Sequence, residues 1–155
     1  MKRLVIPLLL FALLLPLSAC EEDPFAPLRG NVSARGSFTY RGAALEGTLS
    51  LTRSPSLRLT VTLTAPASLR GMVAERTEEG DSLTYLGIRR EMAAPLEALD
   101  LLLLLLTPPD HFERTQTGIQ YKVSDGSVTL LSESTLFRLR YEGERGRAEL
   151  WWQES

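Results

Sequence analysis

The chain has 155 residues, with 17 basic and 19 acidic side chains and a formal net charge of -2. This length suits one domain with a core of its own, and no basic cluster is present of the kind that a nucleic-acid partner would require. The chain contains one cysteine and one histidine. An intrachain disulfide and a transition-metal site built from several thiolates or imidazoles are therefore excluded.

The first twenty residues have the layout of a bacterial lipoprotein signal peptide. A basic start at Lys2 and Arg3 precedes an apolar stretch, and the lipobox sequence Leu17-Ser18-Ala19-Cys20 closes it. The stretch is shorter than the about 20 apolar residues of a membrane-spanning helix and is interrupted by prolines. We therefore expect cleavage after residue 19 and lipidation of Cys20. The alternative is a free thiol behind an ordinary secretory signal.

Lipidation of Cys20 would anchor the protein to a membrane of the bacterial cell envelope. One acyl chain holds a protein only marginally, but the modification that this resemblance implies carries three. The residue after the cysteine is Glu21 rather than aspartate, which favours the outer membrane, with the domain facing the periplasm. We expect residues 1–19 to be the signal peptide, residues 20–30 the acylated cysteine and a polar tether, and residues 31–155 one β domain.

The domain sequence alternates between apolar and polar residues over much of its length. In residues 57–64 every odd position is apolar and every even position is polar, and residues 45–51 repeat the pattern. Apolar side chains also recur at every second position in four more runs: residues 36–40, 119–123, 137–141 and 148–152. This period is typical of strands with one buried face, and the short turns between the runs predict an antiparallel meander.

Residues 95–106 depart from this alternation. The segment is rich in leucine, begins with Pro95 and ends before two further prolines, so the sequence predicts a helix of about three turns with Pro95 in its first turn. One stripe of this helix carries four leucines: Leu96, Leu99, Leu103 and Leu106. The helix is apolar nearly all round, so it must be buried on more than one side. It either completes a packed core or lines a cavity for an apolar ligand.

The sequence lacks the common catalytic motifs. It has no Gly-x-Ser-x-Gly elbow, no phosphate-binding glycine loop and no His-Glu-x-x-His pair. Asp110, His111 and Glu113 could form an acid–base group, but a loop cluster of this kind is usually solvated surface. Carboxylates near a predicted hairpin tip are expected to be solvated as well: Glu75, Glu78, Glu79 and Asp81. We expect a protein that is not an enzyme and that has no cofactor beyond the covalent lipid, although glycoside hydrolysis needs only two carboxylates and stays open.

Three segments resemble the LolA/LolB family. Residues 35–40 (Arg-Gly-Ser-Phe-Thr-Tyr) resemble the first strand of LolB proteins, and residues 63–69 resemble the turn that forms their protruding loop. The predicted helix, followed by Pro108-Pro109-Asp110, matches their central helix. In this family a strongly curved antiparallel sheet, an unfinished barrel, holds helices against its concave face. The lipid-anchored member LolB takes lipoproteins from the carrier LolA at the outer membrane.

The resemblance implies a mainly β fold: a curved antiparallel sheet, or incomplete barrel, with the leucine-rich helix packed on its concave face. It also implies an apolar interior that binds lipid or the acyl chains of lipoproteins. The candidate cavity residues on the sheet and the helix are Phe38, Tyr40, Leu49, Leu51, Leu59, Val61, Leu63, Leu96, Leu99, Leu103, Leu106, Phe137, Leu139 and Tyr141. The candidate loop residues are Pro66 and Leu69, because Ala67 stands where the LolB loop carries a large apolar side chain.

The alternative function is that of a structural or assembly lipoprotein. Such a protein would have a fully packed core and would bind an envelope protein through a strand edge or a loop. Trp151 and Trp152 alternate faces on the last predicted strand, so one of them is expected at the surface, where it could contact a membrane or a partner. A cavity would favour lipid binding, whereas a filled core with an exposed apolar patch would favour the structural role.

Overall fold

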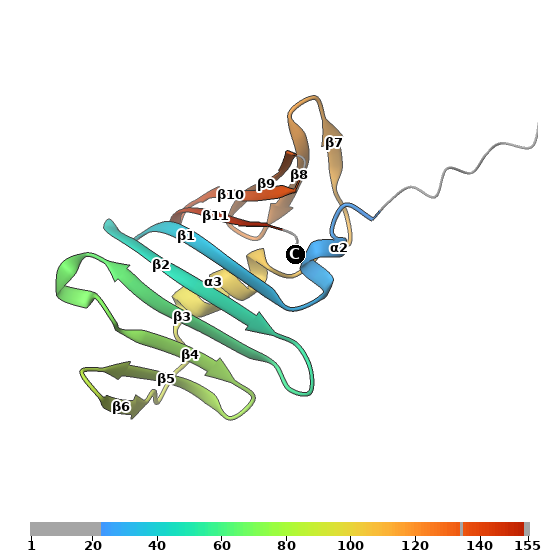
Figure 1. The fold of residues 1–155 in the computed structure, drawn as a ribbon. Helices are drawn as coiled ribbons and strands as arrows, with labels where there is room; N and C mark the ends of the chain where they lie inside the picture. Colours follow the sequence, from blue (N-terminus) through green and yellow to red (C-terminus); the bar gives the residue numbers. More distant parts are fainter. Residues whose placement is uncertain (1–22, 134, 154–155) are drawn as a thin grey trace, which may run out of the picture.

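The structure is a computed structural model that describes residues 23–133 and 135–153. These residues form one curved antiparallel sheet with few helices (Figure 1). The chain is therefore mainly β, as the sequence predicts. The predicted signal peptide, Cys20 and Glu21 lie outside the described residues.

The strands fall into two halves separated by the helix α3 (Glu97–Leu105). The N-terminal half contains β1 (Val32–Tyr40), β2 (Ala43–Thr52), β3 (Arg58–Ala65), β4 (Val73–Thr77), β5 (Gly80–Tyr85) and β6 (Ile88–Glu91). The C-terminal half contains β7 (Glu113–Thr115), β8 (Gly118–Val123), β9 (Gly126–Glu133), β10 (Leu136–Gly143) and β11 (Gly146–Gln153). The other helical segments are α2 (Ala26–Arg29) and the 3-10 turn η1 (Ala67–Leu69).

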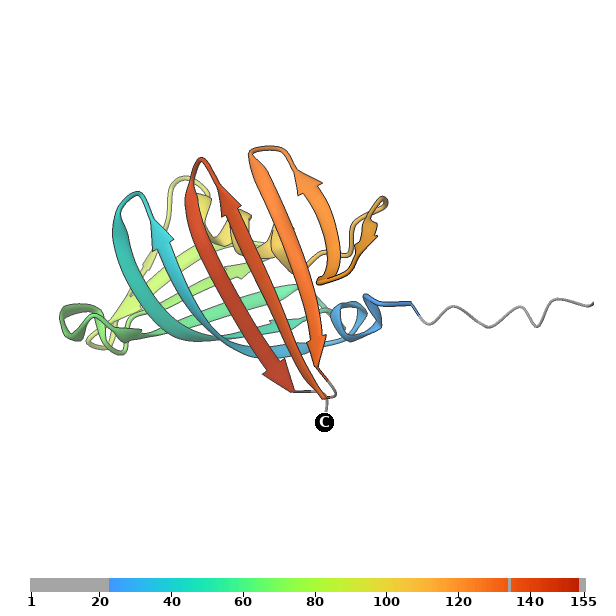
Figure 2. The ribbon, with the colours of Figure 1, turned by 90° about the horizontal axis from the view of Figure 1, so that it is seen from above.

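Each half of the sheet is a meander, in which every strand pairs with its neighbour in sequence. The order across the sheet is β6-β5-β4-β3-β2-β1-β11-β10-β9-β8-β7, so the first and last strands, β1 and β11, join the two halves. With β6 and β7 at its two edges, the sheet curls into an unclosed barrel (Figure 2). Pairing of the first strand with the last brings both halves around one shared core.

The period-two alternation identifies six of the strands correctly: β1, β2, β3, β8, β10 and β11. On β10, for example, Leu139 and Tyr141 are buried while Arg140 between them is exposed. The alternation does not identify β4, β5, β6, β7 and β9. Residues of β4 are all half-buried and those of β6 and β7 are all exposed, so these strands carry no alternation. β9 is different, because Val128 and Leu130 are both buried and do alternate with more exposed residues. This strand could have been predicted from its sequence.

Two glycines face each other on the neighbouring strands β1 and β2. Gly36 pairs with Gly47, and the register between β2 and β3 shifts between Glu46 and Gly47. A Cβ atom on Gly47 would stand 2.6 Å from the carbonyl oxygen of Thr62, and one on Gly36 would stand 2.6 Å from the side chain of Leu150. The Leu150 side chain can move, but the backbone of Thr62 cannot move easily, so glycine is required at position 47 for the close approach of β2 and β3. Irregularities of this kind bend a sheet.

The helix α3 confirms the predicted helix but is shorter, and its buried face overlaps only in part with the predicted leucine stripe. Leu96 is the N-cap residue, so Pro95 lies before the helix and not in its first turn. The cause is a hydrogen bond of 2.6 Å from the amide of Leu96 to Asp81, which holds Leu96 extended. The buried leucines of this segment are Leu99, Leu101, Leu102, Leu105 and Leu106. Leu96 and Leu103 of the predicted stripe are only half-buried. Burial of Leu101, Leu102 and Leu105 beside Leu99 and Leu106 confirms that the helix is buried on more than one side.

The N-terminal segment of the described chain packs against the sheet. Phe25 and Leu28 are 1% and 0% exposed, and the ring of Phe25 makes edge-to-face contacts with Phe112 and with Tyr121 of β8. The predicted polar tether of residues 20–30 is therefore wrong in its second half. The prediction rested on the polar residues around Phe25 and Leu28. Burial of these two large apolar side chains stabilises the packed conformation of the segment.

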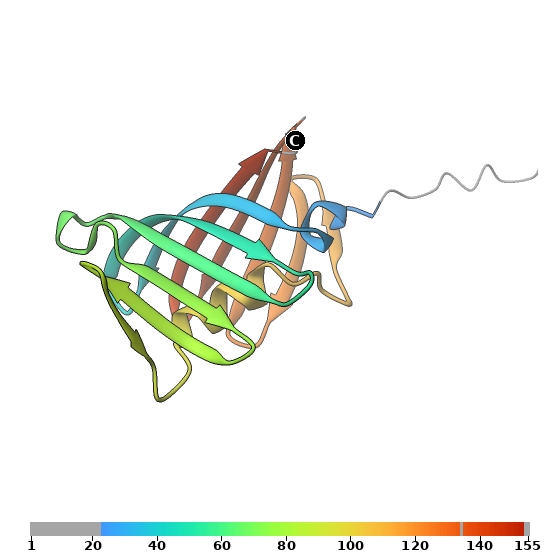
Figure 3. The ribbon, with the colours of Figure 1, turned by 60° about the horizontal axis from the view of Figure 1, so that its bottom comes forward.

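Figure 3 shows α2 and the end of α3 beside the β2–β3 loop, at one end of the sheet. Arg53 lies in this loop and attaches both helices to it. Its guanidinium donates hydrogen bonds to the carbonyl oxygens of Leu28 at 2.9 Å, Gly30 at 3.1 Å and Leu106 at 2.6 Å. These carbonyls end α2 and α3, where a positive charge is favourable. Burial lowers the pKa of Arg53 from its ordinary value, but a guanidinium stays charged at neutral pH.

We expect Gly47→Ala to lower the free energy of unfolding by about 1–3 kcal/mol, because the added methyl group meets backbone and not a movable side chain. Gly30→Ala is the matched control, since a Cβ atom there meets nothing within 4 Å. Urea unfolding followed by circular dichroism measures both variants. Equal stability of the two would contradict the close approach of β2 and β3.

Candidate functional site

A cavity of about 300 Å³ lies between α3 and the strands of the N-terminal half. We refer to it as the apolar cavity. Its walls are formed by Phe38, Thr39, Tyr40, Leu45, Val61, Leu63, Leu69, Met72, Ala74, Leu83, Leu96, Ala98, Leu99, Leu101, Leu102, Arg147 and Ala148. Almost all of these side chains are aliphatic or aromatic. The volume is at the lower end of the range of about 300–1,000 Å³ that small-molecule sites occupy.

Two features of the chain bring these side chains together: the alternation of faces along the strands, and a loop that folds back on itself. Alternation on β1 and β3 turns Phe38 and Val61 to the same face of the sheet as the core. The loop between β3 and β4 then returns on itself, because the amide of Gly71 donates to the carbonyl oxygen of Leu63 and the amide of Leu63 donates to that of Met72, both at 2.9 Å. This return brings η1 and the start of β4 to the cavity wall.

The predicted cavity residues divide into two groups. Those that line the apolar cavity are Phe38, Tyr40, Val61, Leu63, Leu96 and Leu99, and the predicted loop residue Leu69 lines it as well. Those that belong to the packed core or lie against it without lining the cavity are Leu49, Leu51, Leu59, Leu103, Leu106, Phe137, Leu139 and Tyr141. Pro66 is exposed and is the N-cap residue of η1. Phe137 lines a second cavity, described below. The other members of the second group pack in the core or against it.

The sequence does not predict several residues of the cavity wall: Leu45, Met72, Ala74, Leu83, Leu101, Leu102 and Ala148. Leu45 begins a predicted strand, and its alternation with Leu49 could have identified it. Met72 and Leu83 belong to the part of the chain around β4 and β5, where burial does not alternate clearly. Leu102 lies off the predicted leucine stripe of the helix.

A buried ion pair holds the start of α3 against β4 and β5. Arg76 and Asp81 form a two-armed contact with N···O distances of 2.7 Å, and their side chains are 13% and 3% exposed. Asp81 also accepts the amide of Leu96, and Arg76 also pairs with Asp100 in the first turn of α3. The bidentate geometry and these additional partners satisfy charges that would be unfavourable to bury alone.

Asp81 corrects the expectation that the carboxylates near this hairpin are solvated. Glu78 and Glu79 are exposed, but Glu75 is half-buried and Asp81 is buried. The hydrogen bonds from Arg76 lower the pKa of Asp81 below its ordinary value, and they outweigh the opposing effect of burial. Asp81 is therefore ionised at neutral pH and fixes the first residues of α3.

A second polar contact attaches α3 beside the apolar cavity. Glu97 accepts hydrogen bonds from the hydroxyl of Tyr40 and from the guanidinium of Arg41 in the β1–β2 turn. The bond from Tyr40 lowers the pKa of Glu97, and the same bond raises the pKa of Tyr40. Arg41 and Glu97 are both exposed, so solvent screens their attraction and the contact is weak. The start of α3 thus has one strong and one weak attachment.

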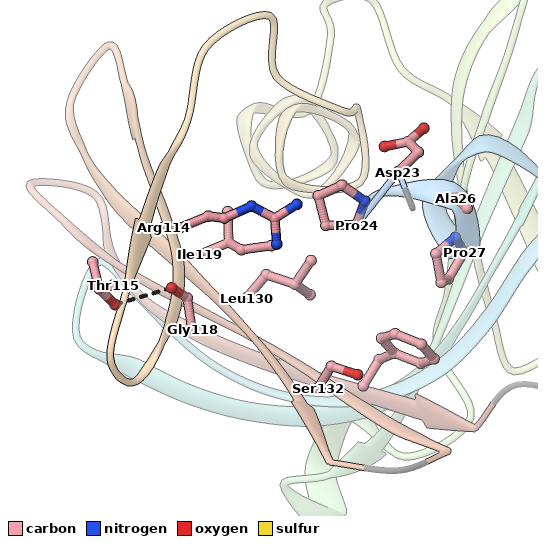
Figure 4. A pocket seen from close by; sticks show the side chains of 11 residues that line it. Asp23, Pro24, Ala26, Pro27, Arg114, Thr115, Gly118, Ile119, Leu130 and Ser132 are labelled. Carbon is pink, nitrogen blue, oxygen red and sulfur yellow. Dashed lines mark hydrogen bonds between the residues drawn. The ribbon is translucent and has the colours of Figure 1, made fainter. Parts of the chain in front are cut away.

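A second cavity, of about 800 Å³, lies between α2 and the strands β7 to β10. We refer to it as the N-terminal cavity. β1 begins beside α2 and ends at Tyr40 of the apolar cavity, so the two cavities lie toward opposite ends of this strand. Figure 4 shows Pro24, Ile119 and Leu130 around the N-terminal cavity, together with the polar side chains of Asp23 and Arg114.

The structure also shows where the other candidate residues of the sequence lie. Among residues 23–133 and 135–153, no group of His, Cys, Asp and Glu side chains is arranged to hold a metal ion. No helix within these ranges is long and apolar enough to cross a membrane. Asp110, His111 and Glu113 are all exposed. Trp152 is buried in the core, and Trp151, on the other face of β11, is half-buried.

Comparisons with protein-family models, with curated proteins and with solved structures find no match for this chain. The geometry of the two cavities is therefore the basis on which a function can be proposed.

We expect acid to destabilise the protein through Asp81. A carboxylate with a lower pKa in the folded chain contributes stability that is fully present above its unfolded pKa of about 3.9 and is lost as the pH falls through the folded pKa. Asp81→Asn should lower the free energy of unfolding at neutral pH by about 2 kcal/mol, because Arg76 loses its two-armed carboxylate partner and keeps only the half-exposed Asp100. It should also flatten the acid dependence of that free energy, measured by urea unfolding from neutral pH to about pH 3.

Glu79→Gln is the control for this experiment, since it removes an exposed carboxylate from the same hairpin. It should change neither the stability at neutral pH nor the acid dependence. An Asp81→Asn variant that keeps the acid dependence of the unchanged protein would contradict the role assigned to Asp81.

Proposed function

We propose that this protein is a lipid-anchored protein of the bacterial cell envelope that binds an acyl chain, of a lipid or of a lipoprotein, in the apolar cavity. The observation that carries the proposal is the lining of that cavity, which consists almost wholly of hydrocarbon side chains. Water finds few hydrogen-bond partners in such a space, so the site favours an apolar occupant.

Binding of this kind needs shape and apolar surface but no reactive group. Each methylene group that moves from water into the cavity contributes about 0.8 kcal/mol. Thr39, Tyr40 and Arg147 supply the polar atoms of the lining. The polar end of a bound amphiphile would therefore lie on their side, with its hydrocarbon against Leu63, Leu101 and the other apolar walls.

In this proposal α3 lies over the concave face of the sheet and acts as a lid. Arg76 and Asp81 hold its start firmly, whereas the contact of Glu97 with Arg41 is open to solvent. An acyl chain would enter beside the β1–β2 turn, because the screened contact separates more easily than the buried one. The lid would then hinge about the buried pair and stay attached to the sheet.

The location in the envelope is proposed from the lipobox at Cys20 and from the resemblance to the LolA/LolB family. A curved, unclosed antiparallel sheet is the architecture that this resemblance implies, and the described residues have it. We extend the proposal to capture of lipoprotein acyl chains under α3 and their release to the outer membrane. The receptor activity of LolB itself is not proposed, because Ala67 replaces the large apolar residue of its protruding loop.

The alternative is a structural lipoprotein that binds an envelope protein. One observation favours it: Leu86 and Ile88, at the β5–β6 turn, are 82% and 65% exposed. Leu86 also has a φ of 50°, a conformation that leucine rarely adopts. Because β6 is an edge strand, its open hydrogen-bonding groups and this apolar turn could together receive a strand of a partner.

Acyl-chain binding predicts that the mature chain, residues 20–155 with Cys20→Ser, forms a one-to-one adduct with a tripalmitoylated lipopeptide in native mass spectrometry. Ala98→Phe should strongly weaken the adduct, because Ala98 lines the apolar cavity and the added ring would fill it. Leu104→Phe is the matched control on the same helix, since Leu104 is partly exposed and does not line the cavity.

Thermal unfolding shows whether Ala98→Phe acts through the fold, because overpacking a filled core lowers stability by about 1–3 kcal/mol. Ala98→Leu is a smaller change at the same position that serves if the phenylalanine variant does not fold. The absence of any adduct between the unchanged mature protein and the lipopeptide would refute lipid binding. Leu86 and Ile88 would then be the first positions to test for a protein partner.

A further inference from the structure

The N-terminal cavity is bordered by the segment of chain that leads to Cys20. Asp23 and Pro24 form part of its wall, and Cys20 precedes Asp23 by three residues. A fully extended chain spans at most about 3.6 Å per residue, so three residues of chain reach at most about 11 Å. A lipid attached to Cys20 would therefore begin close to the N-terminal cavity.

This part of the chain is held in place by packing on both sides of the cavity-lining residues Ala26 and Pro27. Phe25 and Leu28 are buried in the core, and Phe25 contacts Tyr121 of β8. The carboxylate of Asp23 accepts the amide of Phe25 at 3.0 Å. The first described residues after Cys20 are therefore fixed at the border of the N-terminal cavity.

The lining divides into an apolar floor and a polar border. Ile119 of β8 pairs with Leu130 of β9, so both side chains lie on the same face of the sheet, and Phe137 of β10 continues this floor. Asp23 and Ser132 are polar and exposed and contribute to the border (Figure 4). An amphiphile fits such a lining with its hydrocarbon on the floor and its polar linkage at the border.

We propose that the N-terminal cavity holds one acyl chain of the protein's own lipidated Cys20 when the protein is outside the bilayer. The proposal rests on the lipidation of Cys20 that is part of the proposed function, but it is independent of cargo in the apolar cavity. The volume of about 800 Å³ is within the range of small-molecule sites. Binding of the acyl chain in this cavity removes apolar surface from water. It therefore competes with insertion of the acyl chain into a membrane.

Tryptophan fluorescence reports on this cavity. Trp152 stacks on Phe137, which lines the cavity, with ring centroids 5.7 Å apart. The mature chain of residues 20–155 has a single thiol, so Cys20 can be coupled to a hexadecyl maleimide that is brominated near its methyl end. Bromine quenches a nearby indole. The proposal predicts loss of tryptophan emission relative to the same chain without bromine, at a level independent of protein concentration.

Two variants and a matched control test where the chain lies. Ala26→Phe places a ring in the N-terminal cavity and should abolish the loss of emission. Ile119→Gln makes the floor polar and should reduce the loss, and it serves if circular dichroism shows that Ala26→Phe does not fold. Gln116→Phe adds the same ring to the exposed β7–β8 turn, outside the lining, and should leave the loss unchanged.

The proposal is overturned if the brominated chain does not quench the unmodified sequence, or if quenching persists in both cavity variants. Quenching that appears only as the protein concentration rises would also overturn it, because the chain would then lie in a second molecule. Failure here is distinguishable from failure of the proposed function. The mass of the protein extracted from bacterial membranes shows whether Cys20 is lipidated, and the lipopeptide adduct reports on the apolar cavity.

Discussion

The structure depends on one constraint: a large curved sheet has a single apolar face to bury, and one helix of nine residues to pack with it. Such a helix is about 14 Å long, whereas β2, with ten residues, is about 33 Å long. α3 therefore cannot extend along the whole of the strands. Phe25 and Leu28 complete the core at one end, and Leu69 and Met72 reach toward it at the other. Both cavities lie beside these additions, where the packing of short segments against long strands is incomplete.

Charged groups decide how firmly the helix is attached. Arg53 binds the carbonyl oxygen of Leu106 after the end of α3, and the buried pair of Arg76 and Asp81 holds its start. The contact between Arg41 and Glu97 faces solvent and is the weak one. This difference gives the proposed lid a direction of opening, at the β1–β2 turn beside the apolar cavity. It also explains why these four charged side chains near α3, those of Arg41, Arg76, Asp81 and Glu97, occur close to the apolar cavity without lining it.

The sequence predicts those parts of the fold that depend on local patterns. Alternation along 57–64 and the leucine-rich segment at 95–106 are sufficient to identify β3 and α3. Pairing of β1 with β11 is not local, so no pattern in either strand predicts it. A helix that is apolar nearly all round does not reveal its buried face, so the predicted stripe missed Leu102 and Leu105. Burial of Asp81 depends on the start of α3, where the amide of Leu96 binds it, and burial of Phe25 depends on Tyr121 of β8. Both partners are distant in the sequence, so local patterns do not predict these contacts.

The most direct test of acyl-chain binding is photo-crosslinking with a lipopeptide that carries a diazirine near the end of one acyl chain. Irradiation of its complex with the mature chain, followed by peptide mapping, identifies the residues around the bound chain. Binding in the apolar cavity predicts labels at wall positions such as Leu45, Met72 and Leu101. Labels confined to the exposed turn at Leu86, or the absence of any crosslink, would contradict it.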